Sequence, residues 1–327
     1  MILAHNQQLM LGCVSHSPII VVRAHMPEVE TRIIEDCAAF RARVEEFDPD
    51  YIVLFSNDHF ASFHYANMPV FCIGTQCEAV DDVGGTAGNI PVPEETAMEL
   101  VDYLRKADFD PAISYHMRVD HGFSQPLNRL LGGIDRWPLI PIWTSAFTRP
   151  FVSFRRSRLF GEAVGRFVAS SGKRVLILGS GGLSHHPAHY FPLRQDADPK
   201  VYAWQLDGEA GGTMTEEQWF NRLLTMHHQG AEAIVAGTRT IKDMRLNPEF
   251  DRTVLDYISS GDLSPMDNWD HTEIVAKAGV GALEIANWIA ARAAYSTAGG
   301  GAVTAQYDMV PDYAVGYALA QSEAAFK

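Results

Sequence analysis

Cysteine is scarce in this sequence and shows no paired spacing. The four cysteines, Cys13, Cys37, Cys72 and Cys77, form no C-x-x-C motif. A zinc site built from thiolates is therefore not expected. Cys72 and Cys77 lie on either side of a short turn at residues 74–76, and we interpret them as thiols in strands or in the core.

Positive charge is also in short supply. The chain of 327 residues carries 26 Lys and Arg against 40 Asp and Glu, which gives a formal net charge of −14. Nucleic acids and anionic membrane surfaces would repel such a protein, so neither is expected as a partner. A small anionic substrate is still compatible with this charge, because one local arginine is enough to hold it.

Long apolar runs and targeting segments are missing. The most apolar late stretch, residues 278–303, is interrupted by Glu284 and Arg292, which excludes a membrane span. The start of the chain has no basic segment, and Asn6 and Gln7 break up its apolar residues, so no signal peptide is expected. We therefore expect a cytoplasmic protein.

Linkers and nucleotide-binding motifs are missing as well. No Pro-, Gly- or Ser-rich linker and no block of charge divides the chain, so residues 1–327 are expected to form a single domain. The run at 179–185 begins G-x-G, but Ser184 stands at the third glycine position of a dinucleotide-binding motif. There is no phosphate-binding P-loop and no G-x-S-x-G nucleophile motif. The glycines are better explained as a tight turn that brings His185 over a pocket.

Hydrophobic periodicity predicts short strands that alternate with helices. Strands are expected at 8–15, 51–56, 112–116, 138–143 and 174–179, and helices at 28–47, 93–106, 125–131 and 153–170. Residues 69–92 suggest a hairpin or irregular insertion, and 188–213 a loop. From residue 215 the pattern is nearly all helical, at 215–229, 231–242, 248–260, 271–278 and 282–297. This order predicts an α/β fold with a central, largely parallel sheet flanked by helices and a helical C-terminal portion.

Four apolar runs are each followed within a few residues by a histidine. These stretches, 11–16, 52–59, 113–121 and 175–185, end at His16, His59, His121 and His185. Ligands of an open α/β sheet bind beyond the carboxyl ends of the strands, so these four imidazoles are expected to converge. Imidazole suits both metal ligation and proton transfer near neutral pH, and the pattern therefore indicates a metalloenzyme.

Two of these histidines also have a simpler local explanation. His16 fits a hydrogen-bonded loop residue as well as it fits a ligand. Asp58, next to His59, can either orient an imidazole or close the strand in an Asx turn. Asp120 and His121 repeat the same acid–histidine pairing.

A carboxylate is needed to complete a ligand set of two histidines and one acid, the facial triad of non-haem Fe(II) oxygenases. Glu273 follows His271, but its spacing from Asp270 is explained by a helix capping box. Glu284 lies in an apolar segment at the first turn of an expected helix, where the dipole favours an anion. A carboxylate in such surroundings usually has a partner, so Glu284 is preferred.

Two further histidine groups have no functional interpretation at this point. His186, next to His185, is expected to point away from the site. His227 and His228 precede Gly230 and fit a helix C-terminus, where positive charge is favourable.

Several motifs together resemble the class III extradiol ring-cleaving dioxygenases over most of the chain. They are S-H-S-P at 15–18, D-H at 58–59, P-V-P at 91–93, V-D-H-G-F-x-Q-P at 119–126, L-G-G at 131–133, K-R-V-L at 173–176, L-G-S-G-G-L-S-H at 178–185 and E-I-x-x-W-x-A-A at 284–291. Together these motifs are specific, although none is so alone. Asn57 stands where the family pattern has proline.

The resemblance implies a role for each candidate residue. Carried over by position, it makes His16, His59 and Glu284 the ligands of ferrous iron, Fe(2+), His121 the proton donor and His185 the proton acceptor. It implies extradiol cleavage of a substituted catechol, such as 3-(2,3-dihydroxyphenyl)propionate, by O₂ in the catabolism of aromatic compounds. It also implies a homo-oligomer and no organic cofactor.

Two other functions remain open from the residues alone. A Zn²⁺ hydrolase on the same scaffold would use His121 and His185 on metal-bound water. A non-catalytic metal-binding protein would keep the fold without turnover. Metal identity and O₂ uptake with a catechol distinguish these functions. The ring substituent is not specified, although an arginine such as Arg118 or Arg245 could meet a carboxylate on it.

Overall fold

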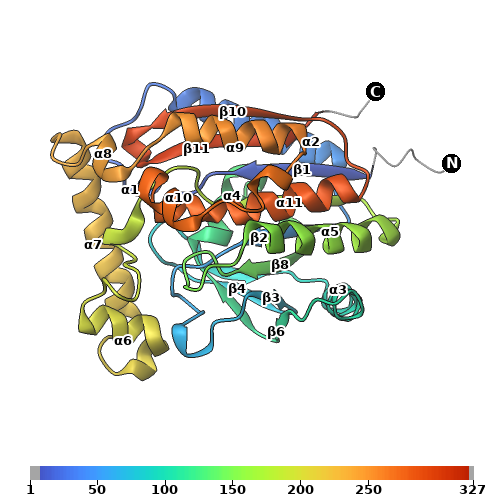
Figure 1. Ribbon diagram of the computed structural model, residues 1–327, viewed down its shortest axis with the longest axis horizontal. Coiled ribbons are helices and arrows are strands. Elements are labelled where there is room, and N and C mark those ends of the chain that lie inside the picture. Colours follow the sequence, from blue (N-terminus) through green and yellow to red (C-terminus); the bar gives the residue numbers. More distant parts are fainter. Residues whose placement is uncertain (1–7, 324–327) are drawn as a thin grey trace.

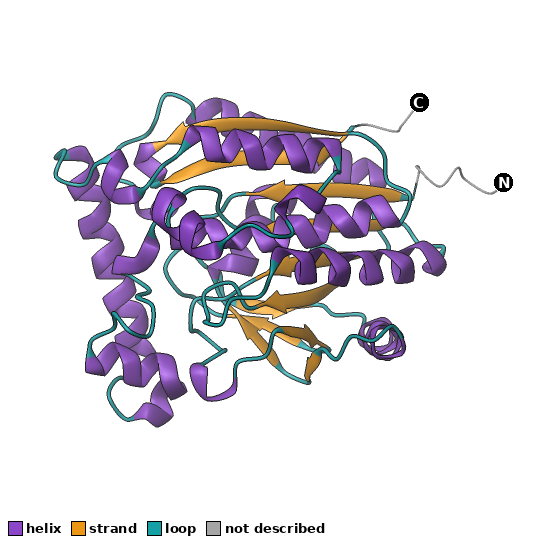
Figure 2. Ribbon diagram, in the orientation of Figure 1, coloured by secondary structure: helices purple, strands orange, loops and turns teal. Residues whose placement is uncertain are grey.

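An eight-stranded sheet forms the centre of the structure, a computed structural model that describes residues 8–323 (Figures 1 and 2). The strand order is β10-β11-β1-β9-β2-β8-β3-β6. These strands are β1 Leu9–Val14, β2 Tyr51–Ser56, β3 Phe71–Gly74, β6 Ala112–Ser114, β8 Leu139–Thr144, β9 Val175–Ser180, β10 Val303–Val310 and β11 Val315–Ser322. Neighbouring strands from β1 to β8 pair in parallel. The predicted largely parallel sheet is therefore confirmed.

The helices mostly follow the periodicity of the sequence. They are α1 Ile19–Val22, α2 Glu30–Phe47, α3 Glu94–Lys106, α4 His121–Leu131, α5 Phe154–Ser171, α6 Pro199–Asp207, α7 Glu216–Val235, α8 Ile241–Met244, α9 Pro248–Ser260, α10 His271–Ala278 and α11 Ile285–Thr297. The predicted helices at 248–260 and 271–278 match α9 and α10. Pro93 precedes α3, and the Ser153 side chain caps α5 by accepting a hydrogen bond from the backbone of Arg156.

The central strands are buried on both faces, which explains their nearly continuous apolar sequences. Leu11 and Val53 belong to a core cluster that includes side chains of α5 and α11. Met10 and Ile52 belong to a second cluster with side chains of α2 and α4. Alternate residues of each strand thus anchor helices on opposite faces of the sheet.

A smaller sheet lies beside the large one. It consists of β5 Gly88–Ile90, β4 Cys77–Ala79 and β7 Met117–Val119 in that order. β4 and β5 pair antiparallel, as the hairpin expected within 69–92 requires. Cys72 and Cys77 are buried free thiols in β3 and β4, in agreement with their interpretation as strand residues.

β9 lies between β1 and β2 in the large sheet and pairs with both. Three predictions about the elements are wrong in detail. The predicted loop 188–213 contains α6. The helices expected at 215–229 and 231–242 are instead one long helix, α7, followed by the short α8. The strand expected at 112–116 is divided between β6 and β7.

The C-terminal portion also contains strands that the sequence analysis missed. β10 and β11 form an antiparallel pair, and β11 pairs antiparallel with β1. β11 gave no strand signal because it contains alanine and glycine, which have low strand propensity. Pairing with β1 overrides that propensity in the fold. The helical part of the prediction holds for α7 to α11. In Figure 1, α6, α7 and α8 gather at one end of the molecule, on the left of the view.

The start of the chain, where no signal peptide is expected, lies outside the described residues, since Asn6 and Gln7 precede residue 8. Within residues 8–323, the helices are too short or too polar to cross a bilayer.

Candidate metal centre

Three of the four candidate histidines follow adjacent strands of the large sheet. His16 comes two residues after β1, His59 three residues after β2, and His185 five residues after β9. Because β1, β9 and β2 are parallel neighbours, their carboxyl ends lie at the same edge of the sheet. The topology therefore brings the three imidazoles together, as predicted.

His121 reaches the same place by a different route. It is the first residue of α4 and follows β7 of the small sheet, so the expectation that a strand of the main sheet delivers it is wrong. The Asp120 side chain caps α4 by accepting from Gly122 N at 2.8 Å. A side chain at Gly122 would place its Cβ 2.3 Å from Asn57 O, so glycine is required where α4 meets the end of β2.

The rings of these histidines form a compact group. The ring centroids of His16 and His59 are 5.3 Å apart, and those of His16 and His121 are 5.4 Å apart. His59 and His121 are stacked, with their centroids 4.2 Å apart. One ligand nitrogen from each of these three residues lies within 4.8 Å of the others, a spacing that fits a shared metal ion.

Glu284 lies at the centre of this group. It ends a 3₁₀ turn, Val280–Glu284, immediately before α11, and it is fully buried. Its carboxylate oxygens are 3.2 Å from His59 Nε2, 3.7 Å from His16 Nε2 and 3.9 Å from His185 Nε2. Gly182 N also donates to the carboxylate. The acid selected from the sequence is thus the one that the histidines surround.

Asn57 contributes a further hydrogen bond at the centre. Its amide Nδ2 donates to Glu284 Oε1 at 3.2 Å, and its Oδ1 accepts from Asn287 Nδ2 at 3.0 Å. Proline, which the family pattern has at this position, could make neither contact.

The second nitrogen of each histidine is held by the protein. His16 Nδ1 is 2.9 Å from Ser180 Oγ, whose own hydrogen is directed to Gly122 O. His59 Nδ1 is 3.2 Å from Asp120 Oδ2. These partners hold the Nδ1 proton of both rings, so both Nε2 atoms are turned toward Glu284, and a bound cation would take the place of a proton on His59 Nε2.

His121 and His185 are fixed in the same way. His121 Nδ1 is hydrogen-bonded to Asp82 Oδ2, and His121 N donates to Asp82 Oδ1 at 2.9 Å. His185 Nδ1 donates to Leu183 O at 3.0 Å. His121 is fully buried, whereas His185 lines the adjoining pocket.

The electrostatics of the centre are dominated by burial and by the acid–histidine contacts. Burial lowers the pKa of His16 and of His121 to about 3. Burial acts in the same direction on His59, but the carboxylates of Asp120 and Glu284 together outweigh it and raise the pKa of His59 to about 10. Burial would raise the pKa of Glu284, yet the neighbouring imidazoles hold it below its ordinary value. The site therefore contains a buried anion among imidazoles.

The donor set fits a divalent cation. The Nε2 atoms of His16 and His121 are buried and have no hydrogen-bond partner among the described residues. Glu284 Oε1 and His59 Nε2 are both acceptors when the imidazole is neutral, and a cation between them would satisfy both. Nitrogen and carboxylate ligands suit Fe(II), Zn²⁺ and related ions.

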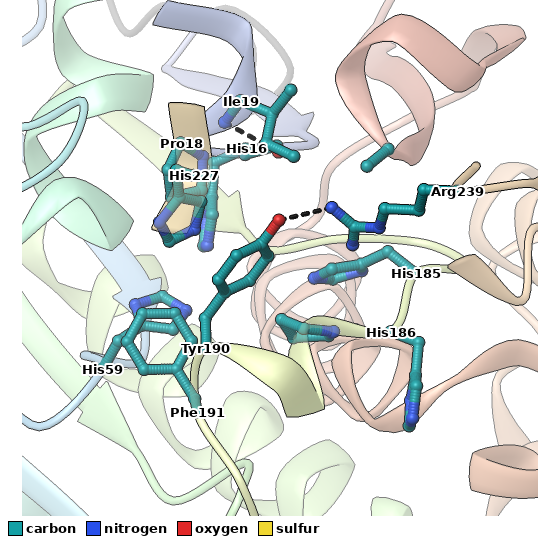
Figure 3. A pocket seen from close by; sticks show the side chains of 13 residues that line it. His16, Pro18, Ile19, His59, His185, His186, Tyr190, Phe191, His227 and Arg239 are labelled. Carbon is teal, nitrogen blue, oxygen red and sulfur yellow. Dashed lines mark hydrogen bonds between the residues drawn. The ribbon is translucent and has the colours of Figure 1, made fainter. Parts of the chain in front are cut away.

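A pocket opens beside the centre (Figure 3). It is lined by His16, Ser17, Pro18, Ile19, His59, His185, His186, Pro187, Tyr190, Phe191, His227, Arg239 and Ala314. The His186 side chain extends away from the other labelled rings in Figure 3, although the residue contributes to the lining. The structure therefore agrees with the expected direction of its side chain.

His227 and Arg239 were missed as pocket residues. Gly230 is not a helix end, since α7 continues to Val235. A Cβ at Gly230 would be 2.0 Å from the Tyr190 hydroxyl, so this glycine makes room for a close contact. The interpretation of His227 and His228 as residues of a helix C-terminus is therefore wrong.

The two arginines suggested for a substrate carboxylate lie outside this pocket. Arg118 Nη1 and Nη2 donate to the carboxylate of Glu216 at 2.6 and 2.9 Å. The Arg245 guanidinium donates to Val275 O. Both side chains already have partners elsewhere.

Comparison with known proteins identifies the family of the chain. A family model described as "Catalytic LigB subunit of aromatic ring-opening dioxygenase" matches residues 10–326. A 2,3-dihydroxyphenylpropionate/2,3-dihydroxicinnamic acid 1,2-dioxygenase of Cupriavidus necator is 36% identical over 318 residues, 97% of this chain and 99% of that protein. A Pseudomonas putida enzyme of the same description is 38% identical over 308 residues, 94% of this chain and 96% of that protein.

A likeness among solved structures is too distant to bear on function. The crystal structure of an uncharacterized Escherichia coli K12 protein matches with a TM-score of 0.47 and 12% identity, covering 96% of this chain and 99% of that chain.

Proposed function

Because the chain belongs to the family of aromatic ring-opening dioxygenases described by the catalytic LigB subunit, we propose that it cleaves a 3-substituted catechol, of the 3-(2,3-dihydroxyphenyl)propionate type, with Fe(2+) and O₂. Family membership makes the chain a dioxygenase that opens catechol-type rings by extradiol cleavage. The metal, the substituent and the role of each residue are our proposal. The observation that carries it is the convergence of His16, His59 and Glu284 with two further histidines beside them.

His16, His59 and Glu284 would hold the iron, as a facial triad that leaves positions open for other ligands. When bound, Fe(II) supplies the redox chemistry that joins the catechol ring to O₂. The contribution of the chain is to orient the three ligands. Ser180 and Asp120 fix the rings of His16 and His59, and Gly182 N and Asn57 fix the carboxylate.

His185 is proposed as the general base. Its Nδ1 hydrogen is directed to Leu183 O, so its Nε2 lone pair is free to take a proton from a catechol hydroxyl. The ring lines the pocket and so can reach a substrate there. A positioned base of this kind accelerates a reaction by about 10²–10⁴-fold.

His121 is proposed as the general acid. Its Nδ1 is hydrogen-bonded to Asp82, which orients the ring, and its buried Nε2 has no protein partner among the described residues. Burial lowers the pKa of this ring, so a proton that Nε2 takes up during turnover is readily released to an oxygen that becomes negative as the ring opens.

The proposal is tested by anaerobic reconstitution with Fe(II) and a panel of 3-substituted catechols. We expect O₂ uptake together with the yellow ring-opened product, and no turnover after loading with Zn²⁺. His121→Ala and His185→Ala should lower kcat about 10²–10⁴-fold. Hydrolase activity with Zn²⁺, or metal binding without O₂ uptake for any catechol, would refute the proposal.

We also propose that residues 1–327 act as one catalytic domain in a cytoplasmic homo-oligomer. The pairing of β1 with β11 supports a single domain. The four buried free thiols are typical of a reducing compartment. β10 ends the large sheet, and among residues 8–323 no strand pairs with its outer side, which leaves an edge that a second copy could cover. Light scattering coupled to size exclusion measures the oligomeric state, and a monomeric mass would refute this part.

A further inference from the structure

The outer wall of the pocket is built by the helical region rather than by the sheet. Tyr190 follows the 3₁₀ turn Pro187–His189, His227 belongs to α7, and Arg239 lies between α7 and α8. In Figure 3 the Arg239 side chain reaches over the pocket toward the Tyr190 hydroxyl. The metal ligands His16 and His59 line the same pocket.

Arg239 brings an unneutralised positive charge to this wall. Its Nη1 donates to the Tyr190 hydroxyl, and its guanidinium lies 5.2 Å from the centroid of the Tyr190 ring. Among residues 8–323, no carboxylate forms an ion pair with it, in contrast to Arg118 with Glu216. Of the residues that line the pocket, all of which are described, Arg239 alone is permanently charged. A guanidinium has five N–H donors, so several remain for a ligand.

The Tyr190 side chain is held in place beside Arg239. Its ring stacks on His227 with centroids 3.8 Å apart, and Gly230 provides the space that its hydroxyl occupies. Since the hydroxyl oxygen accepts from Arg239, its own hydrogen is free to donate to a ligand. His227 Nδ1 donates to Leu223 O at 2.7 Å, and burial lowers the pKa of His227 to about 3, so this ring adds no like charge beside Arg239.

We propose that Arg239, with the Tyr190 hydroxyl, binds the carboxylate of the ring substituent and selects catechols with an anionic side chain. This inference rests on the proposed function, because it assigns the orientation of the substrate in that same site. The diol would face His16, His59 and Glu284, and the substituent would extend toward the helical wall. A guanidinium pairs with a carboxylate through two parallel hydrogen bonds, which gives both affinity and direction.

The test compares two substrates in one variant. Arg239→Gln should lower kcat/KM for 3-(2,3-dihydroxyphenyl)propionate by about 10- to 100-fold, mainly through KM, because a hydrogen-bonded charge pair is lost. For 3-propylcatechol, which has no charge, kcat/KM should change by less than about 3-fold, within the scatter of a surface substitution. Arg194→Gln, which removes an exposed arginine outside the pocket, should leave the ratio between the substrates unchanged.

A binding measurement separates this inference from the proposed chemistry. 3-Phenylpropionate lacks both hydroxyls and is not turned over, so its Kd by calorimetry needs no catalysis. Arg239→Gln should weaken the binding of 3-phenylpropionate about 10-fold or more. Arg239→Lys keeps the positive charge and should retain part of the affinity, and it serves as the test if Arg239→Gln fails to fold. Equal losses for propyl and propionate substrates, or unchanged 3-phenylpropionate binding, would overturn the role of Arg239. Failure of every catechol with wild-type enzyme would instead refute the proposed function.

Discussion

At the scale of single residues, the four site histidines share one feature: the Nδ1 atom of each is hydrogen-bonded to another group of the protein. The acceptors are a serine hydroxyl, two carboxylates and a backbone carbonyl, for His16, His59, His121 and His185 in turn. This arrangement fixes each ring and leaves Nε2 for a metal or a proton. One tautomer is thus selected four times by unrelated local means.

The histidines and Glu284 could be selected from the sequence, but their partners could not. Asp58 does not orient His59; its Oδ2 accepts from the backbone N–H groups of Ala61, Ser62 and Phe63, so the Asx-type interpretation is the right one. Asp120, next to His121, orients His59 instead. Adjacent residues in a loop point in different directions, so hydrogen-bond partners follow from the fold rather than from adjacency.

The proposed ligands and the proposed acid–base residues should separate in their metal content. His16→Ala and His59→Ala are expected to lose iron, because each removes an Nε2 that faces Glu284. His121→Ala and His185→Ala are expected to retain it while losing turnover. Elemental analysis of the purified variants measures this. Full iron content in His59→Ala would contradict the ligand assignment, as would loss of iron from His185→Ala.

Asp82 is expected to act as a positioning residue for His121. Asp82→Asn replaces one of the two oxygens that hold His121 by an amide nitrogen and so orients the ring less well, and kcat should fall about 10- to 100-fold with iron content and KM preserved. The exposed neighbour Asp81 offers a matched control, and Asp81→Asn should behave as wild type. A change in KM alone would argue against this role.

At the scale of elements, α5 and α11 approach closely because glycines on α5 face the backbone of α11. A Cβ at Gly161 would lie 2.2 Å from Ala290 O, and one at Gly165 would lie 2.3 Å from Ala294 O. α11 follows directly after Glu284, so this contact also fixes the position of the carboxylate.

A larger side chain at this contact should separate the two helices. Gly165→Val is expected to lower the free energy of unfolding by about 1–3 kcal/mol, the usual cost of overpacking, and to reduce iron affinity. Gly301→Ala is the control, because a Cβ there meets nothing within 4 Å. Urea unfolding of both variants measures the difference. Equal stabilities would show that the helices can separate at no cost.

The elements that sequence analysis found are those with strong local patterns. β2 and α9 matched closely because each has a continuous apolar run or a clear helical periodicity between stop signals. β11 did not, since its small residues acquire strand structure only by pairing with β1 and β10. Gly230 was misjudged because its role is a contact with Tyr190, which lies 40 positions away in the sequence.

At the scale of the whole molecule, the sheet and the helical region each supply a different part of the site. The carboxyl ends of β1, β9 and β2 supply the histidines, and α6 to α8 lie together at one end of the molecule in Figure 1. The pocket lies between residues of both regions. The sheet's contribution was predictable from its strand-to-histidine pattern, whereas the helical wall carries no such pattern.

Iron should stabilise the whole fold through the centre. A ligand that binds only the native state at about 100 times its Kd adds about 2.7 kcal/mol to the free energy of unfolding. Anaerobic thermal unfolding with and without Fe(II) measures this gain. Glu284→Gln, which keeps the size of the side chain but removes the anion, should abolish most of it. An identical gain in that variant would place the iron elsewhere.

The pairing of β1 with β11 has a consequence for the biogenesis of the enzyme. Ser15 Oγ donates to Gly316 O, a partner 301 positions further along the chain, and Ser17 Oγ donates to Tyr313 O. The segment that carries His16 therefore emerges from the ribosome long before the residues that secure it. Metal binding at the proposed centre is then expected only after β11 has been made, and a nascent chain stalled before β11 should lack a competent centre.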